Sequence, residues 1–489
     1  MAAPMFWDGA PNALAYLAFL AFPVVIVVLF TRMKPHVAGA YSLLGGVLFL
    51  PEVLEFDLPV IPPLNKATIT AVCVLVAMAW KAPQRLGAAR AFRGFDLFFV
   101  LALFGNVMTA MTNSDVIVTG PVVRPALTLY DAFAGSVKDT LGIWLPYFLA
   151  RSLCRTPEEL GELVRITLRM GVAYTFFCLF EARFSPQLHR WVYGYHAADF
   201  SMTMRGGGYR PTAFMLHGLA VANFVLSGTM LSITQWKLGK AKGWLVAYMA
   251  GVLAICRSSG AIIYAVMFLP LMARVKKPRF ILPVVLGVLV LTFPILRGTG
   301  TFPTEWLVEK AETYLSEERA LSLWFRFDNE DTLLERARER LWFGWGGYDR
   351  NRVFDPVTGE DLVITDGDWM IQLGVGGAVG FIGRYSLLVL PIFVLFRKRK
   401  KISDRKQLLL YSGWAMIAGL NAVELLPNGL FSWLPYFYSG VLAGAVGAIG
   451  TARAVIPLRP RGPAARAQER ASLAPPMPKP GRGGRVVAA

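Results

Sequence analysis

Long apolar blocks dominate this chain and restrict what it can fold into. Blocks such as Leu14 to Phe30, Phe95 to Leu103 and Phe280 to Leu296 are separated by short charged connections, with no alternating or one-sided pattern. Only 17% of the residues are charged, whereas about a quarter is usual in a globular protein. About 20 apolar residues in a helix cross the roughly 30 Å hydrocarbon layer, where polar backbone groups require helical structure. The chain is therefore expected to be a polytopic membrane protein.

The same blocks predict an all-α fold with about 12 or 13 transmembrane helices. A shallow hairpin would also explain the pair 243–256 and 259–273, and 37–51 is the other short span. The first dozen residues contain Asp8 and no Lys or Arg, so they do not resemble a signal-peptide n-region, and the N-terminus is expected outside. The predicted spans are 13–30, 37–51, 67–80, 95–111, 137–150, 165–181, 211–232, 243–256, 259–273, 280–297, 377–396, 407–425 and 431–450.

The net charge of +18 is explained by topology. With alternating spans, most Lys and Arg fall in loops on one side, including the run Arg397 to Lys401, and the positive-inside rule makes that side cytoplasmic. No basic cluster is interleaved with stacking aromatics on a soluble fold, so nucleic acid is not an expected partner. The four cysteines show no CxxC spacing, and we expect no disulfide, metal or cofactor.

Four regions follow from this topology. Residues 1–297 form an N-terminal transmembrane bundle, 298–376 one large periplasmic loop containing helices, 377–450 the C-terminal transmembrane helices, and 451–489 a disordered basic cytoplasmic tail. Within the loop, the apolar spacing of Asp328 to Trp342 predicts an amphipathic helix that starts at Asp328 and stops before Gly344. A membrane protein with one long external loop usually uses it for function.

Two predicted external junctions place arginines beside the membrane. The first is the run Arg205 to Pro211, whose glycines let a ligand approach the backbone just before a helix, with His217 two turns further on. An interfacial turn with anchoring arginines is the alternative. The second is Arg257, flanked by apolar helix on both sides, which suits either a ligand or a structural ion pair. Outward-facing arginines beside acyl chains suit a lipid-linked phosphate or pyrophosphate.

The loop returns to the membrane through Asp366, Asp368 and Trp369. Paired carboxylates beside an aromatic ring suit a general base or sugar binding, while Asp366 is equally suited to capping a helix. Arg384, inside the following span, is either a ligand group facing a cavity or a charge paired with another span.

Four segments resemble the O-antigen ligase/polymerase superfamily of bacterial polysaccharide enzymes, over about residues 200 to 400. Their order around one long loop makes the set more specific than any one segment. The segments are GYRPTAFMLHGLA (208–220), CRSSGA (256–261), NEDTLLERARERLWFGWGGYDR (329–350) and ITDGDWMIQLGVGGAVGF (364–381).

This resemblance implies a glycosyltransferase that moves a glycan from undecaprenyl pyrophosphate to an acceptor hydroxyl on the periplasmic face of the bacterial inner membrane. Arg210 and Arg257 would stabilise the departing pyrophosphate without a metal, and Asp366 or Asp368 would activate the acceptor hydroxyl. The family's ligases usually carry a loop histidine, but this chain has none after His217, which favours a polymerase or exopolysaccharide variant. The candidate substrate-binding residues are Arg205, Tyr209, His217, Arg326, Glu330, Trp345, Arg350, Trp369 and Arg384.

The leading interpretation is a polymerase that joins lipid-linked repeats into exopolysaccharide or O-antigen. An O-antigen ligase acting on another acceptor shares this chemistry, and a lipid-linked glycan flippase or transporter is the alternative from another class. A transporter should show two similar halves, and the sequence shows no such repeat. Expected partners are the lipid-linked glycan donor, a glycan acceptor, the bilayer, and chain-length regulator or export proteins.

Overall fold

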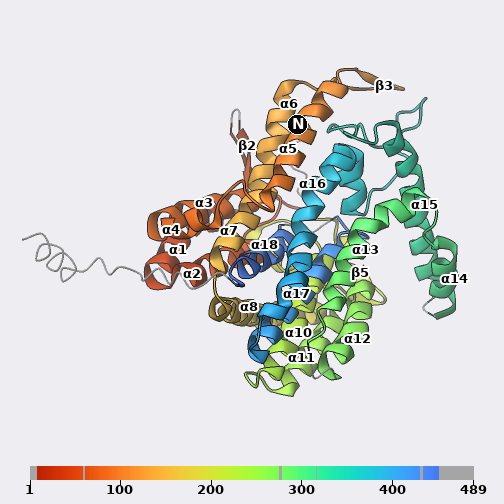
Figure 1. The fold of residues 1–489 in the computed structure, drawn as a ribbon. Helices are drawn as coiled ribbons and strands as arrows, with labels where there is room; N and C mark the ends of the chain where they lie inside the picture. Colours follow the sequence, from red (N-terminus) through yellow and green to blue (C-terminus); the bar gives the residue numbers. More distant parts are fainter. Residues whose placement is uncertain (1–7, 59–60, 275–277, 315, 430–432, 451–489) are drawn as a thin grey trace, which may run out of the picture. The chain divides into compact units, whose positions relative to one another are not determined.

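The computed structural model describes residues 8–58, 61–274, 278–314, 316–429 and 433–450. A first compact unit spans Met1–Ile449. The predicted tail from residue 451 lies outside the described residues. Helices make up most of the described chain, and the strands form only short two-stranded antiparallel hairpins (Figure 1).

Five described helices are long and apolar enough to cross a membrane, as expected of a membrane protein. The number becomes six if α3 (Lys66–Lys81) and α4 (Pro83–Ala89), bent by 110°, count as one broken span. The five are α1 (Ala13–Arg32), α8 (Pro157–Phe184), α10 (Gly218–Lys237), α13 (Ile281–Gly298) and α16 (Asp368–Lys398) with the 3₁₀ turn Arg399–Lys401.

The remaining elements are shorter or less apolar. Four are apolar helices: α2 (Pro35–Phe49), α5 (Asp96–Thr112), α11 (Gly243–Ile255) and α12 (Ser259–Arg274). The others are α6 (Leu129–Asp139), continued through a π turn (Thr140–Trp144) into α7 (Leu145–Leu153), then α9 (Leu188–Tyr193), α17 (Arg405–Glu424) and α18 (Leu434–Gly447). The hairpins pair β1 (Glu55–Leu58) with β2 (Ile61–Asn65), β3 (Ile117–Thr119) with β4 (Val122–Arg124), and β5 (Met204–Arg205) with β6 (Gly208–Tyr209). A 3₁₀ turn (Phe200–Thr203) directly precedes β5.

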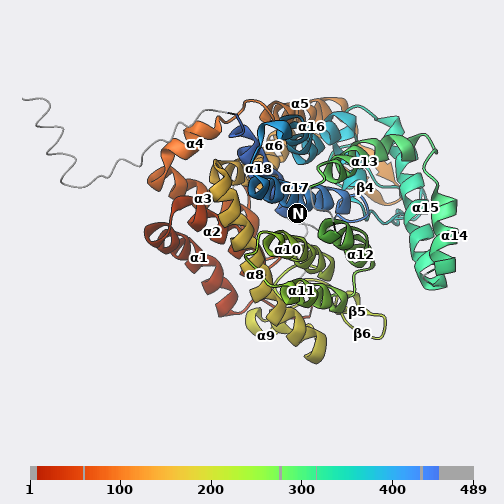
Figure 2. The same cartoon turned by 60° about the horizontal axis from the view of Figure 1, so that its bottom comes forward.

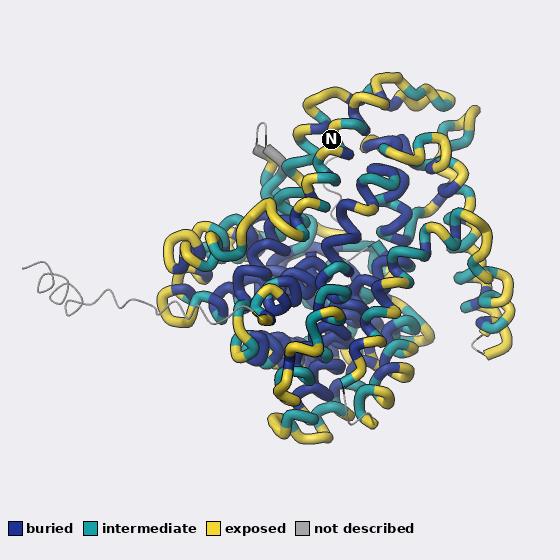
Figure 3. Tube along the Cα trace, in the orientation of Figure 1, coloured by how far each residue is buried: buried dark blue, intermediate teal, exposed yellow. Residues whose placement is uncertain are grey.

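Each predicted span overlaps a helix among the described residues, although 137–150 runs from α6 through the π turn into α7. Only five or six helices are long and apolar enough to cross a membrane, fewer than the 12 or 13 expected. The span predicted from residue 211 begins only at Gly218, because the backbone of 211–217 is not helical. Helices α10, α17 and α18 are largely buried, and α17 contacts both α10 and α18 (Figures 2 and 3). Asn421 of α17 donates to Ser227 of α10 at 2.9 Å and accepts from Asn223 at 2.7 Å, so a buried polar ladder joins these two helices.

A buried ion pair fixes α7 against α5. Both terminal nitrogens of Arg151 donate to the Asp96 carboxylate, at 2.8 and 2.7 Å. This two-bond geometry compensates much of the desolvation that both charges undergo in an apolar interior.

Residues 298–367 contain two helices, α14 (Thr304–Tyr314) and α15 (Glu317–Glu339), which pack along each other (Figure 2). The sequence predicted the second helix but placed its start at Asp328, which is wrong by eleven residues. Ser316 caps α15 by accepting from the Arg319 backbone N–H at 3.3 Å. The apolar residues before Asp328 therefore continue the helix instead of preceding it.

Helix α16 is broken at Gly377, which has φ 64° and ψ −169°. The backbone groups freed by this break pair with the turn that follows α15. Ala378 N–H donates to Leu341 at 2.7 Å, and Trp345 N–H donates to Gly374 at 2.8 Å. The break thus joins the loop to the membrane helix through backbone hydrogen bonds, which satisfy groups that a bilayer cannot.

Replacing Gly377 with alanine is expected to destabilise the protein by about 3 kcal/mol or more, because only glycine adopts this backbone conformation readily. A Cβ at this position would also lie 2.4 Å from the carbonyl of Trp342. The thermal unfolding midpoint in detergent measures the effect. Gly251→Ala, in α11 with open space around it, is the control and should be neutral or slightly stabilising. An unchanged midpoint in Gly377→Ala would contradict this account of the break.

Candidate functional site

Five arginines from three parts of the chain gather around one point and form what we name the arginine cluster: Arg205, Arg210, Arg257, Arg319 and Arg326. Arg210 Nη2 donates to the backbone carbonyl of Arg257 at 3.2 Å, and Arg257 Nη1 donates to that of Arg205 at 2.9 Å. Arg205, Arg319 and Arg326 lie close enough for their charges to act on Arg210. Burial first, and these charges second, lower the pKa of Arg210 to about 10, so its guanidinium stays charged at neutral pH.

The positive charge of the arginine cluster is largely uncompensated. Across the described residues, Arg326 is its only member with a carboxylate partner, Asp366, at 3.0 Å. The Nε–H groups of Arg205 and Arg210 are buried and donate no hydrogen bond to the protein. Arg210 is buried and the other four arginines are half-buried. Like charges held together with limited solvent raise the free energy of the empty site, and an anion bound there would lower it.

Two glycines make room for these guanidinium groups. A Cβ on Gly208 would lie 2.3 Å from Arg257 Nη2, and one on Gly218 would lie 2.4 Å from Arg210 Cδ. Arg257 itself has φ +51°, a conformation that non-glycine residues rarely adopt and that clusters at functional sites.

Charged groups beneath the surface hold the non-helical segment 211–217, which connects Arg210 to the start of α10. Glu181 of α8 accepts from the backbone N–H groups of Thr212 at 2.8 Å and Ala213 at 2.7 Å. Lys66 pairs with Glu52 at 2.5 Å and donates to the Phe214 carbonyl at 3.3 Å. Glu181, Glu52 and Lys66 were not predicted as site residues. Their charges at the ends of apolar spans are a signal in the sequence that could have identified them.

His217 ends this segment as the N-cap of α10, where its Nδ1 accepts from the Leu219 N–H at 3.1 Å. Burial, and then the charges of Arg210, Arg205 and Arg326, lower the pKa of His217 to about 4. The residue is therefore a neutral cap at physiological pH and adds no charge to the arginine cluster.

The lowered pKa of His217 predicts acid sensitivity. In the unfolded chain this histidine binds a proton below about pH 6.5, but in the folded protein only below about pH 4, so acidification favours unfolding across that window. The loss from this group approaches about 3 kcal/mol. We expect His217→Asn, which retains an N-cap acceptor, to lose less thermal stability between pH 7 and 4.5 than the wild type. His189, whose pKa burial lowers to about 4, contributes equally in both proteins. If the thermal stabilities of the wild type and of His217→Asn fell by the same amount between pH 7 and 4.5, the assignment to His217 would be contradicted.

A cavity of about 260 Å³ opens beside the arginine cluster, between α12, α13, α15, α17 and the start of α16. Its wall is mainly apolar and includes Phe293, Phe302 and Phe327. The polar groups in the wall are Tyr264, Arg326, Glu330 and Asp366. An apolar pocket with a few convergent polar groups is typical of a ligand site.

The three predicted carboxylates lie in different surroundings. Asp366 lines the cavity and pairs with Arg326. Glu330 pairs with Arg297 at 3.0 Å, and burial raises its pKa although Arg297 opposes the shift. Asp368 lies in a separate network, where it accepts from Tyr385 at 2.8 Å and from Gln372 at 3.1 Å. Of the two proposed bases, only Asp366 lies at the cavity.

The predicted aromatic platforms are not accessible. Trp369 is fully buried, donates to Glu330 at 3.2 Å and packs edge-on against Phe293. The ring of Trp345 is buried beneath Arg336, whose guanidinium carbon lies 3.3 Å from the ring centroid. Both candidate substrate-binding tryptophans therefore pack against protein, and neither ring offers a free face to a sugar in this structure. Tyr209 is half-buried on β6, with its ring near Phe200.

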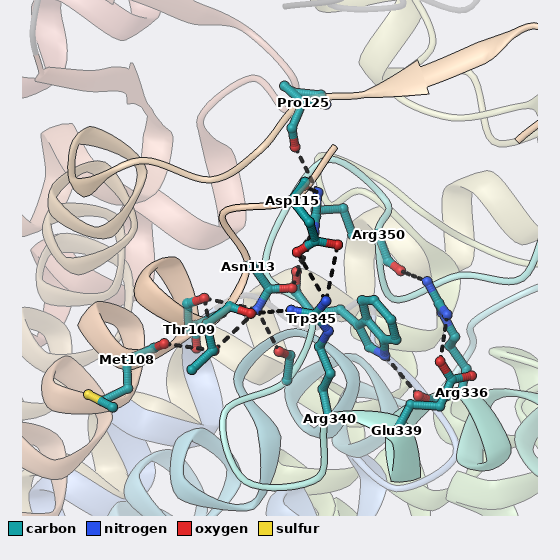
Figure 4. Close-up of polar contacts among 12 residues, drawn as sticks. Met108, Thr109, Asn113, Asp115, Pro125, Arg336, Glu339, Arg340, Trp345 and Arg350 are labelled. Atoms are coloured by element: carbon teal, nitrogen blue, oxygen red, sulfur yellow. Dashed lines mark hydrogen bonds and ion pairs between the residues drawn. The ribbon is translucent and has the colours of Figure 1, made fainter. Parts of the chain in front are cut away.

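Two further predicted arginines lie in other networks. Arg384 pairs with Asp139 of α6 at 2.5 Å and donates to Asn106 of α5 at 3.2 Å. Of the two alternatives for Arg384, this contact favours a structural ion pair with another helix over a ligand group. Arg350 is only 1% exposed and donates to the backbone of Asp115 and Pro125 at 2.8 Å each (Figure 4). Its other hydrogen bonds go to Trp345, Asn113 and the Asp115 side chain, so every guanidinium nitrogen has a protein partner.

A comparison with models of known protein families finds no match for this chain, and no curated protein matches it. Within the described ranges, no group of three or more His, Cys, Asp and Glu side chains is placed to hold a metal ion.

Proposed function

We propose that this protein is a glycosyltransferase that polymerises undecaprenyl-pyrophosphate-linked oligosaccharide repeats at the periplasmic face of the bacterial inner membrane. The observation that carries the proposal is the arginine cluster, four of whose five members have no carboxylate partner in the described structure, beside a mainly apolar cavity. A lipid-linked pyrophosphate matches both features, since it joins a strongly anionic group to an apolar chain.

Arginine suits this role better than lysine. Its planar guanidinium donates two parallel hydrogen bonds to phosphate oxygens, and low polarity around the group strengthens each contact. The hydrogen bond from Arg257 to the Arg205 carbonyl positions Arg257 before the substrate binds, and Glu181 holds the backbone that follows Arg210. Such preorganised positive charge stabilises a leaving group that becomes more negative in the transition state.

The orientation of the site follows from the basic loops. The run Arg397 to Lys401, at the end of α16, is expected in the cytoplasm by the positive-inside rule. Asp368, at the opposite end of the same helix, then faces the periplasm together with the preceding loop. The N-terminus is periplasmic and the C-terminus cytoplasmic in this arrangement.

In the reaction, the acceptor hydroxyl of one lipid-linked repeat attacks the anomeric carbon of the glycan on a second lipid. The bond to pyrophosphate breaks, and the arginine cluster stabilises the departing undecaprenyl pyrophosphate. The Arg326–Asp366 pair, which is partly exposed at the cavity, is placed to exchange its mutual contact for contacts with substrate.

Reconstitution in nanodiscs with a synthetic undecaprenyl-pyrophosphate-linked repeat tests the proposal. A ladder of longer lipid-linked glycans supports a polymerase, transfer to a different acceptor supports a ligase, and movement across the bilayer without new bonds supports a flippase. Arg169→Ala is the matched control, because this exposed arginine of α8 lies twelve residues, about 18 Å, along the helix from Glu181. It should leave the ladder unchanged.

A further inference from the structure

We propose that Glu424 is the base that accepts the proton of the acceptor hydroxyl, an inference that depends on the glycosyltransferase function proposed above. Glu424 is the last residue of α17 and only 2% exposed. It was not among the residues predicted from the sequence, where it reads as one charge at the end of an apolar span.

One oxygen of the Glu424 carboxylate makes no hydrogen bond of normal geometry. Asn428 donates to Oε1 at 3.0 Å, while Oε2 is buried without a hydrogen-bond partner. Among all buried side-chain atoms of the described residues that lack a partner, Oε2 is the only carboxylate oxygen. A buried carboxylate with an unsatisfied oxygen is energetically unfavourable, and its retention calls for a partner that arrives with a ligand.

The other carboxylates around the site are already engaged. Asp366 is paired with Arg326, Glu330 with Arg297 and Trp369, and both oxygens of Asp368 accept from side chains. Glu181 accepts three backbone N–H groups. A base must accept a new proton in the transition state. Glu424 Oε2 makes no hydrogen bond of normal geometry and is placed to do so, with the Tyr264 hydroxyl facing the carboxyl.

The position of Glu424 connects the cavity with the arginine cluster. Its chain neighbours Val423 and Leu426 line the cavity, as does Tyr264, whose hydroxyl faces the Glu424 carboxyl. Arg326, which also lines the cavity, is close enough to act on Glu424 electrostatically.

On the opposite side, Glu424 faces Gly260 near the start of α12. A Cβ on Gly260 would lie 3.7 Å from Oε2 and 3.8 Å from Oε1, so a side chain at this position would contact the carboxyl. Gly260 is three residues from Arg257. An acceptor hydroxyl entering here would therefore lie between the base and the group that binds the leaving pyrophosphate.

The chemical step balances with these groups. The acceptor oxygen forms a bond to the anomeric carbon and gives its proton to Glu424 Oε2. The bond from the anomeric carbon to the pyrophosphate oxygen breaks, and its electron pair leaves with undecaprenyl pyrophosphate. General bases of this kind contribute about 10²- to 10⁴-fold to a rate.

Glu424→Gln tests the assignment, because the amide keeps the shape and an oxygen for Asn428 but cannot take the proton. We expect kcat for ladder formation to fall by about 100-fold or more, with the KM for the lipid-linked repeat changed less than about threefold. Glu424→Asp should recover part of the lost rate. Glu335→Gln, an exposed carboxylate of α15, is the control and should match the wild type.

A second variant decides the question if Glu424→Gln fails to fold. Gly260→Ala adds one methyl group at ordinary contact distance from the carboxyl, so it restricts approach to Oε2 without overlap, and we expect the fold to be kept. We expect a loss of about tenfold or more in kcat. A purely structural Glu424 would not respond to this methyl group.

The outcomes separate the two proposals. If the wild type forms ladders and either folded Glu424→Gln or Gly260→Ala does so at the full rate, the role of Glu424 is overturned and the polymerase function stands. If the wild type itself forms no glycosidic bond, the proposed function fails and the role of Glu424 fails with it.

Discussion

Replacing Arg210 or Arg257 with alanine is expected to reduce the rate of glycan transfer by about 10²- to 10³-fold, as when one preorganised donor to a developing negative charge is removed. Both guanidinium groups belong to the arginine cluster, and each lacks a carboxylate partner among the described residues. Lysine at either position should retain only part of the wild-type rate, because it keeps the charge but cannot donate two parallel hydrogen bonds to a phosphate. The measurement is the initial rate of ladder formation from the synthetic repeat in nanodiscs.

The two arginines should not act independently. Arg210 Nη2 donates to the Arg257 backbone, so a change at one residue alters the setting of the other. The double alanine variant is therefore expected to lose less than the product of the two single losses. Rates within twofold of wild type in both single variants, with Arg169→Ala also unchanged, would contradict the role of the cluster.

Replacing Arg350 with methionine is expected to destabilise the folded protein by about 3–5 kcal/mol, although this residue belongs neither to the arginine cluster nor to the cavity wall. Its guanidinium joins the backbone of Asp115, Pro125 and Trp345 and the side chain of Asn113 (Figure 4). Removing it leaves these acceptors without a partner in a buried position. The thermal unfolding midpoint in detergent measures the loss, and hydrogen exchange at residues 113–127 should rise first.

A matched control separates this effect from a general loss of charge. Arg338→Met removes an exposed arginine of α15 that makes one hydrogen bond, to the Gly298 carbonyl at 2.7 Å, and should cost less than about 1 kcal/mol. An unfolding midpoint for Arg350→Met equal to that of Arg338→Met would refute the structural role of Arg350.

Hydrophobicity predicted the helices well and their interruptions poorly. Each predicted span overlaps a helix among the described residues, because long apolar runs leave the backbone no other way to satisfy its polar groups in a membrane. The break at Gly377 and the non-helical segment 211–217 were missed. Both depend on partners distant in the sequence, the turn after α15 and Glu181, which local spacing does not reveal.

The arginines were the most informative residues for the site. Arg205, Arg210 and Arg257 were singled out because positive charge is unusual where the topology places them, and the structure brings them together with Arg326. The aromatic and carboxylate predictions were less successful. A sequence does not distinguish a buried, engaged Trp369 or Asp368 from an accessible one, since the difference lies in tertiary packing.

Counting both products of one reaction tests the central claim most directly. The protein in nanodiscs is given the synthetic undecaprenyl-pyrophosphate-linked repeat, and new glycosidic linkages and released undecaprenyl pyrophosphate are quantified together. We predict one released lipid pyrophosphate for each linkage in the wild type, and strong suppression of both in the Arg210→Ala/Arg257→Ala protein. Intact donor after prolonged incubation with the wild type, or equal yields from the double variant, would contradict the account.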